Sequence, residues 1–340
     1  MVSGMDRNSP GDLLERAQTA FKVRDFEQSL RLSLRLRELR PTDPVPVFLL
    51  GTVYDHLGKL KESIEAFETA QSLDPDNAAV YNNLAVIYRK KGQLKKARAV
   101  MKEAFNRAPD RADIAYNLGN FYKAERQDAL AESYYRKAIE LDPPFTLAYN
   151  NLGTLLVSAG RIEEACAVYR TGLSHDRNNP SLHYNLGVAL DMLGEYRDSL
   201  AEFDRALKSK PGWTEGMNNR GILLEKTGNL PAAEEAFSTL LSLNPENHQA
   251  RNNLGVALLK QGRTEEAESC FRSVLESDPG YSLGVMNLGE TLSREGAHQD
   301  AVELLQNHHK KDPDNLEIRL HLARALLASE IGRASCRERV

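Results

Sequence analysis

Cysteine is scarce in this chain, and its scarcity excludes a disulfide framework and a cysteine-based zinc site. The 340 residues contain three cysteines, none of them in a CxxC arrangement. Long apolar runs are also missing, since no stretch approaches the length that crosses a bilayer and the mean hydropathy is −0.49. The first residues lack the apolar segment of a secretory signal. We therefore expect a cytoplasmic protein with no membrane partner.

A strong excess of charge of one sign is absent as well. The net charge is −4 and the pI is about 6.1, which argues against a broad nucleic-acid-binding surface. The chain contains no glycine-rich phosphate loop, no HExxH and no GxSxG motif. We therefore expect no enzymatic activity in the region present, no cofactor and no nucleic-acid partner.

The pair of histidines in "HHKK" at 308–311 is the strongest candidate for a metal site. Adjacent residues on a helix project about 100° apart, so His308 and His309 form a poor chelating pair. We interpret them as surface or capping residues and expect no metal site. Cys166 and Cys270 are interpreted as small buried or half-buried residues.

What the chain has is an internal repeat. Leu-Gly pairs at 118/119, 152/153, 186/187, 254/255 and 288/289 are separated by 34 residues or by a multiple of 34. The prolines Pro75, Pro109, Pro143, Pro211, Pro245, Pro279 and Pro313 keep the same step. This phase defines nine repeats without insertion, starting at residues 10, 44, 78, 112, 146, 180, 214, 248 and 282, and the first helix of a tenth from Leu316.

Each repeat reads as two antiparallel helices when its positions are counted from its first residue. Small residues at positions 8 and 20, such as Gly119 and Ala131, allow the two helices to approach closely. Glycine at position 15 permits the turn between them. Proline at position 32 ends the second helix. Because one such pair cannot bury its apolar face alone, neighbouring pairs are expected to stack.

The pattern resembles the tetratricopeptide repeat family, whose signature combines aromatic, Leu-Gly, Ala and Pro positions at this period. The repeat at 78–111 shows the resemblance with Tyr81, Leu84, Ala85, Tyr88, Gly92, Ala97, Met101, Ala104 and Pro109. The resemblance covers nearly the whole chain. It implies an all-α fold, a right-handed α-solenoid of helix-turn-helix units with a concave inner groove.

An asparagine recurs at position 6 of seven successive repeats. These residues are Asn83, Asn117, Asn151, Asn185, Asn219, Asn253 and Asn287. Rotation of about 100° per residue places position 6 on the side of the first helix opposite positions 4, 7, 8 and 11, which face the core. In the family this side lines the groove, and the row is similar to that of the repeat domain of O-linked N-acetylglucosamine transferase. The amides either grip the backbone of a peptide or bond neighbouring helices and water.

Charged residues at other groove positions vary between repeats. Arg89, Lys90 and Lys123 form a basic section. Such a section either favours an acidic segment of a partner or is a solvated face.

The two ends of the chain are expected to differ from the array of residues 10–329. Residues 1–9 are predicted to be disordered. Residues 330–340, which read "EIGRASCRERV", break the repeat phase. They resemble the translation of a sequencing-adapter oligonucleotide, so we interpret them as a non-native tail. The helix 316–328 is apolar on nearly every side, and such an exposed face can support self-association.

The leading functional hypothesis is a scaffold that binds an extended peptide or a helix of a partner protein in its concave groove. The alternative hypothesis is a substrate-binding arm of a larger enzyme, for example a glycosyltransferase, whose catalytic domain is not in this chain.

Overall fold

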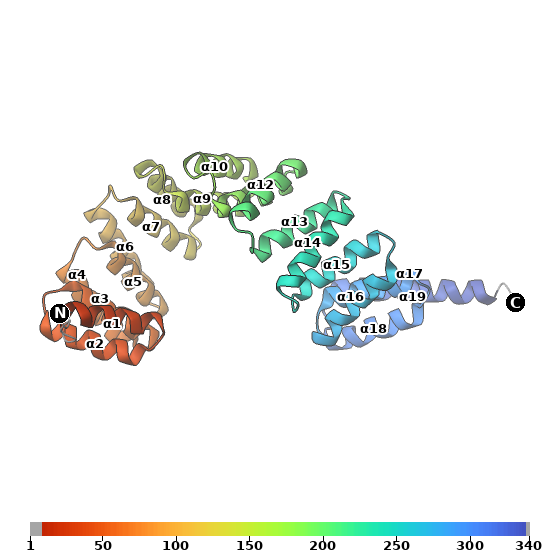
Figure 1. Cartoon of the computed structure of the whole chain (residues 1–340), viewed down its shortest axis with the longest axis horizontal. Coiled ribbons are helices and arrows are strands. Elements are labelled where there is room, and N and C mark those ends of the chain that lie inside the picture. The colour runs from red at the N-terminus through yellow and green to blue at the C-terminus, as the bar shows by residue number, and fades with distance from the viewer. Residues whose placement is uncertain (1–8, 338–340) are drawn as a thin grey trace, which may run out of the picture. The chain divides into compact units, whose positions relative to one another are not determined.

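The computed structural model describes the backbone of residues 9–337 and the side chains of residues 9–330. Within these residues it contains nineteen helices and no strand (Figure 1). The chain divides into two compact units, Met1–Ala159 and Gly160–Val340. The predicted fold class, an all-α solenoid of helix-turn-helix units, is confirmed.

Unit 1 (Met1–Ala159) contains the first nine helices. They are α1 (Pro10–Lys22), α2 (Phe26–Leu39), α3 (Pro44–His56), α4 (Leu60–Leu73), α5 (Ala78–Lys90), α6 (Leu94–Arg107), α7 (Ala112–Ala124), α8 (Asp128–Leu141) and α9 (Thr146–Ser158). Odd-numbered helices are the first helices of the repeats, and even-numbered helices are the second helices.

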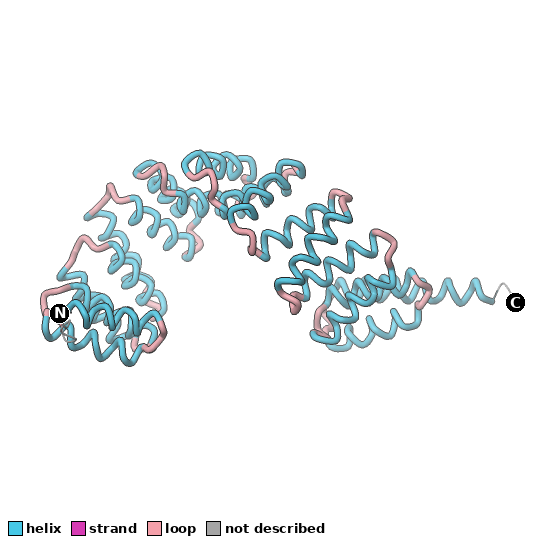
Figure 2. Tube along the Cα trace, viewed as in Figure 1, coloured by secondary structure: helices cyan, strands magenta, loops and turns pink. Residues whose placement is uncertain are grey.

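Unit 2 (Gly160–Val340) contains the other ten. They are α10 (Ile162–His175), α11 (Pro180–Met192), α12 (Tyr196–Ser209), α13 (Thr214–Lys226), α14 (Leu230–Leu243), α15 (His248–Lys260), α16 (Thr264–Ser277), α17 (Ser282–Arg294), α18 (His298–Lys311) and α19 (Leu316–Arg337). Short loops join the helices in both units (Figure 2). Inside each unit every helix packs against the next, and first helices also contact the first helix of the following repeat, as α13 does with α15.

The two helices of a repeat approach closely where glycine faces an aromatic ring. A Cβ atom placed on Gly221 would lie 2.6 Å from the Phe237 ring, and one on Gly119 would lie 2.5 Å from the Tyr135 ring. These distances are shorter than van der Waals contact, so only glycine fits without movement. Where position 20 is serine, its hydroxyl closes the contact, since Ser199 Oγ donates to the Gly187 carbonyl at 2.6 Å. The two helices of a pair are therefore closely packed, and their buried residues join those of the neighbouring repeat, as Phe237 joins Ala257.

The turn between the two helices requires a residue with positive φ. Glycine takes this role in most repeats, for example Gly228 with φ 83°. Two repeats of unit 1 use arginine instead, because Arg24 and Arg126 adopt φ values of 63° and 57°. The turn thus survives without the glycine that the sequence pattern associates with it.

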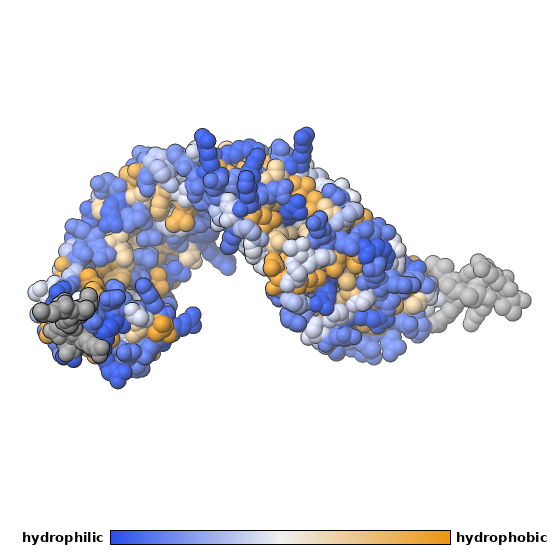
Figure 3. All heavy atoms as spheres, viewed as in Figure 1, coloured by the Kyte–Doolittle hydropathy of each residue, from blue (hydrophilic) through white to orange (hydrophobic). Residues whose placement is uncertain are grey.

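Hydrophilic and hydrophobic residues are unevenly distributed on the visible face of the two units. On the face shown in Figure 3, hydrophilic residues cover most of each unit, and hydrophobic residues form smaller groups between them. None of the helices that the structure describes is long and apolar enough to cross a membrane.

The predictions for the chain ends fall largely outside the described residues. Of the segment 1–9 only Ser9 is described, and its hydroxyl accepts a hydrogen bond from the Asp12 amide at the start of α1. At the other end, α19 continues as one helix through Arg337, while residues 338–340 and the side chains after Glu330 lie outside the description. The non-native origin of residues 330–340 stays a prediction.

Candidate functional site: asparagine rows on the first helices

In unit 2 the position-6 asparagines tie each first helix to the one before it. Asn219 Nδ2 donates to Tyr184 Oη at 2.7 Å, which links α13 to α11. The next repeats continue the pattern with Asn218 and Asn252 as acceptors. Asn253 Nδ2 donates to Asn218 Oδ1 at 3.1 Å, and Asn287 Nδ2 donates to Asn252 Oδ1 at 2.9 Å. Each acceptor stands at position 5 of the preceding repeat.

These bonds occupy only part of each amide. The carbonyl oxygens of Asn219, Asn253 and Asn287 accept no hydrogen bond from any described residue, and they are not among the buried atoms that lack a partner. All three residues are half-buried. Each amide carries two N–H groups, so one N–H and the carbonyl remain for solvent or a ligand. We call these three residues the unit 2 row; Asn185 on α11 is half-buried as well.

Tyr184 is the acceptor for Asn219, the first member of the row. Its hydroxyl accepts from Asn219 and donates to Glu215 Oε1 at 3.1 Å. Burial raises the pKa of Tyr184 above its usual value, and the neighbouring Glu215 carboxylate raises it further. The ring lies 4.6 Å from that of Trp213. Tyr184 is therefore a neutral hydroxyl held in a fixed place.

Unit 1 has a different arrangement. Asn151 Nδ2 donates to both Tyr116 Oη at 3.0 Å and Asn120 Oδ1 at 2.8 Å. Asn83 on α5 and Asn117 on α7 are half-buried, and their side chains form no hydrogen bond with any described residue. Position 5 before Asn83 is Phe48, which has no group to accept an N–H. Of the three position-6 asparagines in unit 1, only Asn151 is therefore hydrogen-bonded to the preceding repeat.

The predicted basic section is partly neutralised. Lys90 Nζ lies 2.6 Å from Asp55 Oδ1 of the preceding repeat. Arg89 and Lys123 are half-buried and form no ion pair with the described residues. In unit 2 the same pairing recurs, with Lys226 Nζ 2.7 Å from Asp191 Oδ1.

Sequence reasoning overlooked the residues that hold the asparagines in place. Position 5 is asparagine or tyrosine in six successive repeats, in the dipeptides "NN" and "YN" that begin at Asn82, Tyr116, Asn150, Tyr184, Asn218 and Asn252. This recurrence was the available signal for a hydrogen bond between residues 35 apart.

Other candidate chemical groups are held by structural contacts. No group of three or more His, Cys, Asp and Glu residues in the described part of the chain could hold a metal ion. His308 is buried rather than exposed or capping, because position 27 faces the first helix, where its Nε2 lies 3.2 Å from Ser282 Oγ. Burial raises the pKa of both Cys166 and Cys270, which keeps these thiols protonated.

The last helix has an exposed apolar face. The α19 residues Leu316, Leu320, Leu326 and Leu327 are all exposed, while Ile318 and Ala325 are buried against α17 and α18. Self-association through this face stays a prediction.

Known protein families match nearly the whole chain. Models described as tetratricopeptide repeats match residues 14–78, 56–120 and 112–145. The model described as the C-terminal domain of cilia and flagella-associated protein 70 matches residues 146–338, which is more than half of the chain. No curated protein matches the sequence significantly.

Solved structures show the same fold at low identity. The C-terminal part of a tetratricopeptide repeat protein from Cytophaga hutchinsonii has 18% identity over 71% of this chain and 99% of its own, with a TM-score of 0.56. Cut9–Hcn1 of the APC/C has 16% identity over 94% of this chain and 64% of its own, with a TM-score of 0.53. PilF of Pseudomonas aeruginosa has 19% identity over 61% of this chain and 95% of its own, with a TM-score of 0.50. Together with its helix pairs, these matches show that the chain belongs to the tetratricopeptide repeat proteins, in the family of the C-terminal domain of cilia and flagella-associated protein 70.

Proposed function

We propose that the chain is a protein-interaction scaffold that binds an extended segment of a partner protein along its first helices. The observation that carries the proposal is the unit 2 row, in which Asn219, Asn253 and Asn287 each direct one N–H to the preceding repeat and leave a carbonyl unbonded. A carbonyl with a neighbouring N–H complements a peptide group. Because each amide is already held, it loses little side-chain entropy when a ligand binds.

The spacing of the row supports the same ligand. Packed helices are separated by about 8–10 Å, and an extended peptide advances about 3.3 Å per residue. One step of the row therefore corresponds to roughly every third residue of the ligand. Contacts to the backbone at this interval allow many sequences to bind, and other groove residues then select among them.

Besides its unbonded asparagines, unit 1 has two cationic side chains without an ion-pair partner, so we assign it an acidic ligand. Arg89 on α5 and Lys123 on α7 form no ion pair with described residues. A segment rich in Asp and Glu complements these two charges. The family takes its description from a protein associated with cilia and flagella. Proteins of these organelles are therefore the first partners to test.

The test is a peptide selection followed by measured affinities. The full chain selects binders from two display libraries of equal size, one of random peptides and one of fragments of ciliary and flagellar proteins. Dissociation constants for selected peptides are then measured by fluorescence anisotropy with the wild type and with the triple variant N219A/N253A/N287A. The control variant N229A/N244A/N307A removes three exposed asparagines outside the row.

The row variant is expected to bind at least about tenfold more weakly, since each hydrogen bond contributes about 0.5–1.5 kcal/mol. The control variant is expected to bind like the wild type, and N-methylation of the ligand's backbone is expected to weaken binding. Y184F, which removes the hydroxyl that holds Asn219 but keeps the amide, separates helix stacking from ligand contact. Equal affinity of the wild type and the row variant would show that the amides only join helices.

A further inference from the structure

A cleft in unit 2 lies outside the asparagine row. An inference drawn from it is therefore independent of the proposed function. It is formed by the loop before α11, the first turn of α11 and the second half of α12. The charged or polar side chains on its walls are Arg177, Asn178, His183, Arg205, Lys208 and Ser209, and its volume is about 710 Å³. No carboxylate lines it.

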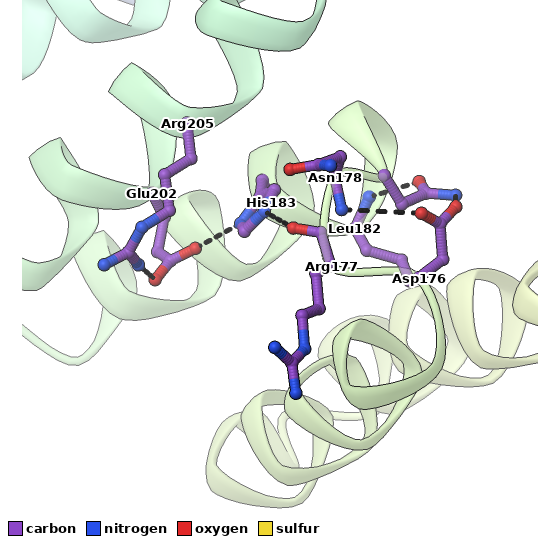
Figure 4. Close-up of polar contacts among 8 residues, drawn as sticks. Asp176, Arg177, Asn178, Leu182, His183, Glu202 and Arg205 are labelled. Carbon is purple, nitrogen blue, oxygen red and sulfur yellow. Dashed lines mark hydrogen bonds and ion pairs between the residues drawn. The ribbon is translucent and has the colours of Figure 1, made fainter.

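The base of the cleft is a buried chain of polar contacts, drawn in Figure 4. His183 Nε2 lies 2.9 Å from the backbone oxygen of Arg177, and because a carbonyl only accepts, this nitrogen donates. His183 Nδ1 lies 2.5 Å from Glu202 Oε2, so a proton lies between these two atoms. The other oxygen of Glu202 pairs with Arg205 Nη1. Both oxygens of Glu202 are therefore used inside the protein.

The second nearby carboxylate is also occupied. Asp176 accepts from Asn179 Nδ2 at 2.9 Å and from the backbone N–H of Asn178 at 3.4 Å. Figure 4 shows Asp176 and Glu202 on opposite sides of His183. Asp176 is not part of the cleft wall, so neither carboxylate competes with a ligand there.

The cations of the cleft have unused hydrogen-bond donors. Arg177 and Lys208 are exposed, and their side chains form no hydrogen bond or ion pair with any described residue. Arg177 extends away from His183 in Figure 4, and no described residue holds its guanidinium in that direction. Arg205 is exposed and uses one nitrogen for Glu202. Three positive charges therefore border one concave site.

The repeat at 248–281 provides an internal comparison, because a cleft at the same repeat positions has the opposite character. Its walls include Glu246 and Glu276 in place of Asn178 and Lys208. Its arginine, Arg251, is already bonded to Ser273 Oγ at 2.6 Å and to the Pro245 carbonyl at 2.5 Å. The cationic cleft is thus a feature of one repeat and not of the repeat geometry.

We propose that the cationic cleft binds the phosphate of a phosphorylated serine or threonine in a partner protein. A phosphate monoester carries close to two negative charges and three acceptor oxygens, which match three cations with free N–H groups. The isolated cluster on a chain of net charge −4 differs from the extended basic surface that a polynucleotide requires. The surrounding volume holds the residues that flank the phosphate.

The test uses the full chain and N-acetyl-phosphoserine amide as the probe. Titration is followed by the backbone amide NMR signals of residues 176–179, 181–183 and 205–209. R177A/K208A removes the two cations that have no partner and leaves the His183 contacts intact. R170A/K311A removes two exposed positive charges elsewhere in unit 2 and serves as the matched control.

Saturable shifts at these residues that weaken about tenfold or more in R177A/K208A, but not in R170A/K311A, support the proposal. Unphosphorylated N-acetyl-serine amide is expected to cause no shifts. Absence of saturable shifts, or equal affinity in the two variants, would overturn it. Tighter binding of phosphatidylserine vesicles or of a short polyuridylate at the same residues would overturn the assignment to a phosphorylated protein.

Discussion

Neighbouring repeats are joined differently in the two units, although their helices recur at the same period. In unit 2 each member of the row donates to position 5 of the preceding repeat. In unit 1 only Asn151 donates in this way, while Asn83 and Asn117 form no such bond with the described residues. Position 5 explains only part of the difference: Phe48, before Asn83, cannot accept an N–H, whereas Asn82, before Asn117, carries an amide carbonyl that accepts none from Asn117.

Contacts between a second helix and the turn of the next repeat also differ between the two units. In unit 2 Glu234 of α14 accepts from Arg263 Nη1 at 2.7 Å and from Gln261 Nε2 at 2.9 Å, both in the turn of the next repeat. In unit 1 the charges are reversed: Arg98 takes the repeat position of Glu234 and Glu125 that of Gln261, and Arg98 Nη2 lies 3.8 Å from Glu125 Oε2. Arg98 Nε is buried there without a partner. One scaffold therefore accommodates tight and loose junctions between repeats.

The largest expected effect is on the amide bonds themselves. Asn252 is 4% exposed and is the acceptor for Asn287, so Asn252→Leu leaves a half-buried N–H without its partner. We expect it to lower the local free energy of opening in unit 2 by about 1–2 kcal/mol. Asn82→Leu, at the same position in unit 1, is expected to change that quantity by less than about 0.5 kcal/mol. Native-state hydrogen exchange of α17 and α7 measures both, and equal losses would remove the contrast between the units.

A smaller effect is expected at the turns. Arg126 holds φ 57° and Gly228 holds φ 83° at the same repeat position. Arg126→Gly is expected to stabilise unit 1 by about 0.5 kcal/mol, because glycine adopts this conformation without the strain of a side chain. Gly228→Ala is expected to destabilise unit 2 by about 1 kcal/mol. Thermal unfolding followed by circular dichroism measures the two changes, which should have opposite signs.

The smallest effect is the acid dependence of the Glu234 contact. The hydrogen bond from Arg263, and then that from Gln261, lowers the pKa of Glu234 in the folded chain. Its stabilising contribution is therefore present above the pKa of an unfolded glutamate, about 4.3, and is lost as the pH falls through the lowered value. Glu234→Gln should flatten part of the fall in melting temperature between about pH 5 and pH 3.

The unit 1 counterpart, Glu125→Gln, removes a carboxylate that is 3.8 Å from its guanidinium. We expect it to change the acid dependence less than Glu234→Gln does. An equal or larger change in Glu125→Gln would contradict the assignment of the tighter junction to unit 2.

The fold class could be predicted from the sequence because a period of 34 residues with glycine, alanine and proline in phase permits few arrangements. The direction of Asn219 and its equivalents follows from helical rotation alone. Their partners do not, because a bond between residues 35 apart depends on how two repeats pack. Likewise, Arg126 at positive φ and the buried His308 depend on tertiary contacts that outweigh local preference.

The unit 2 row also has a polarity. Every described amide bond in it is donated by the later repeat and accepted by the earlier one. The bonded N–H groups of the row therefore all point toward the preceding, more amino-terminal repeat. We therefore expect the two directions of a bound peptide to be inequivalent along the row, because its N–H and carbonyl groups follow one another in the opposite order when the peptide is reversed.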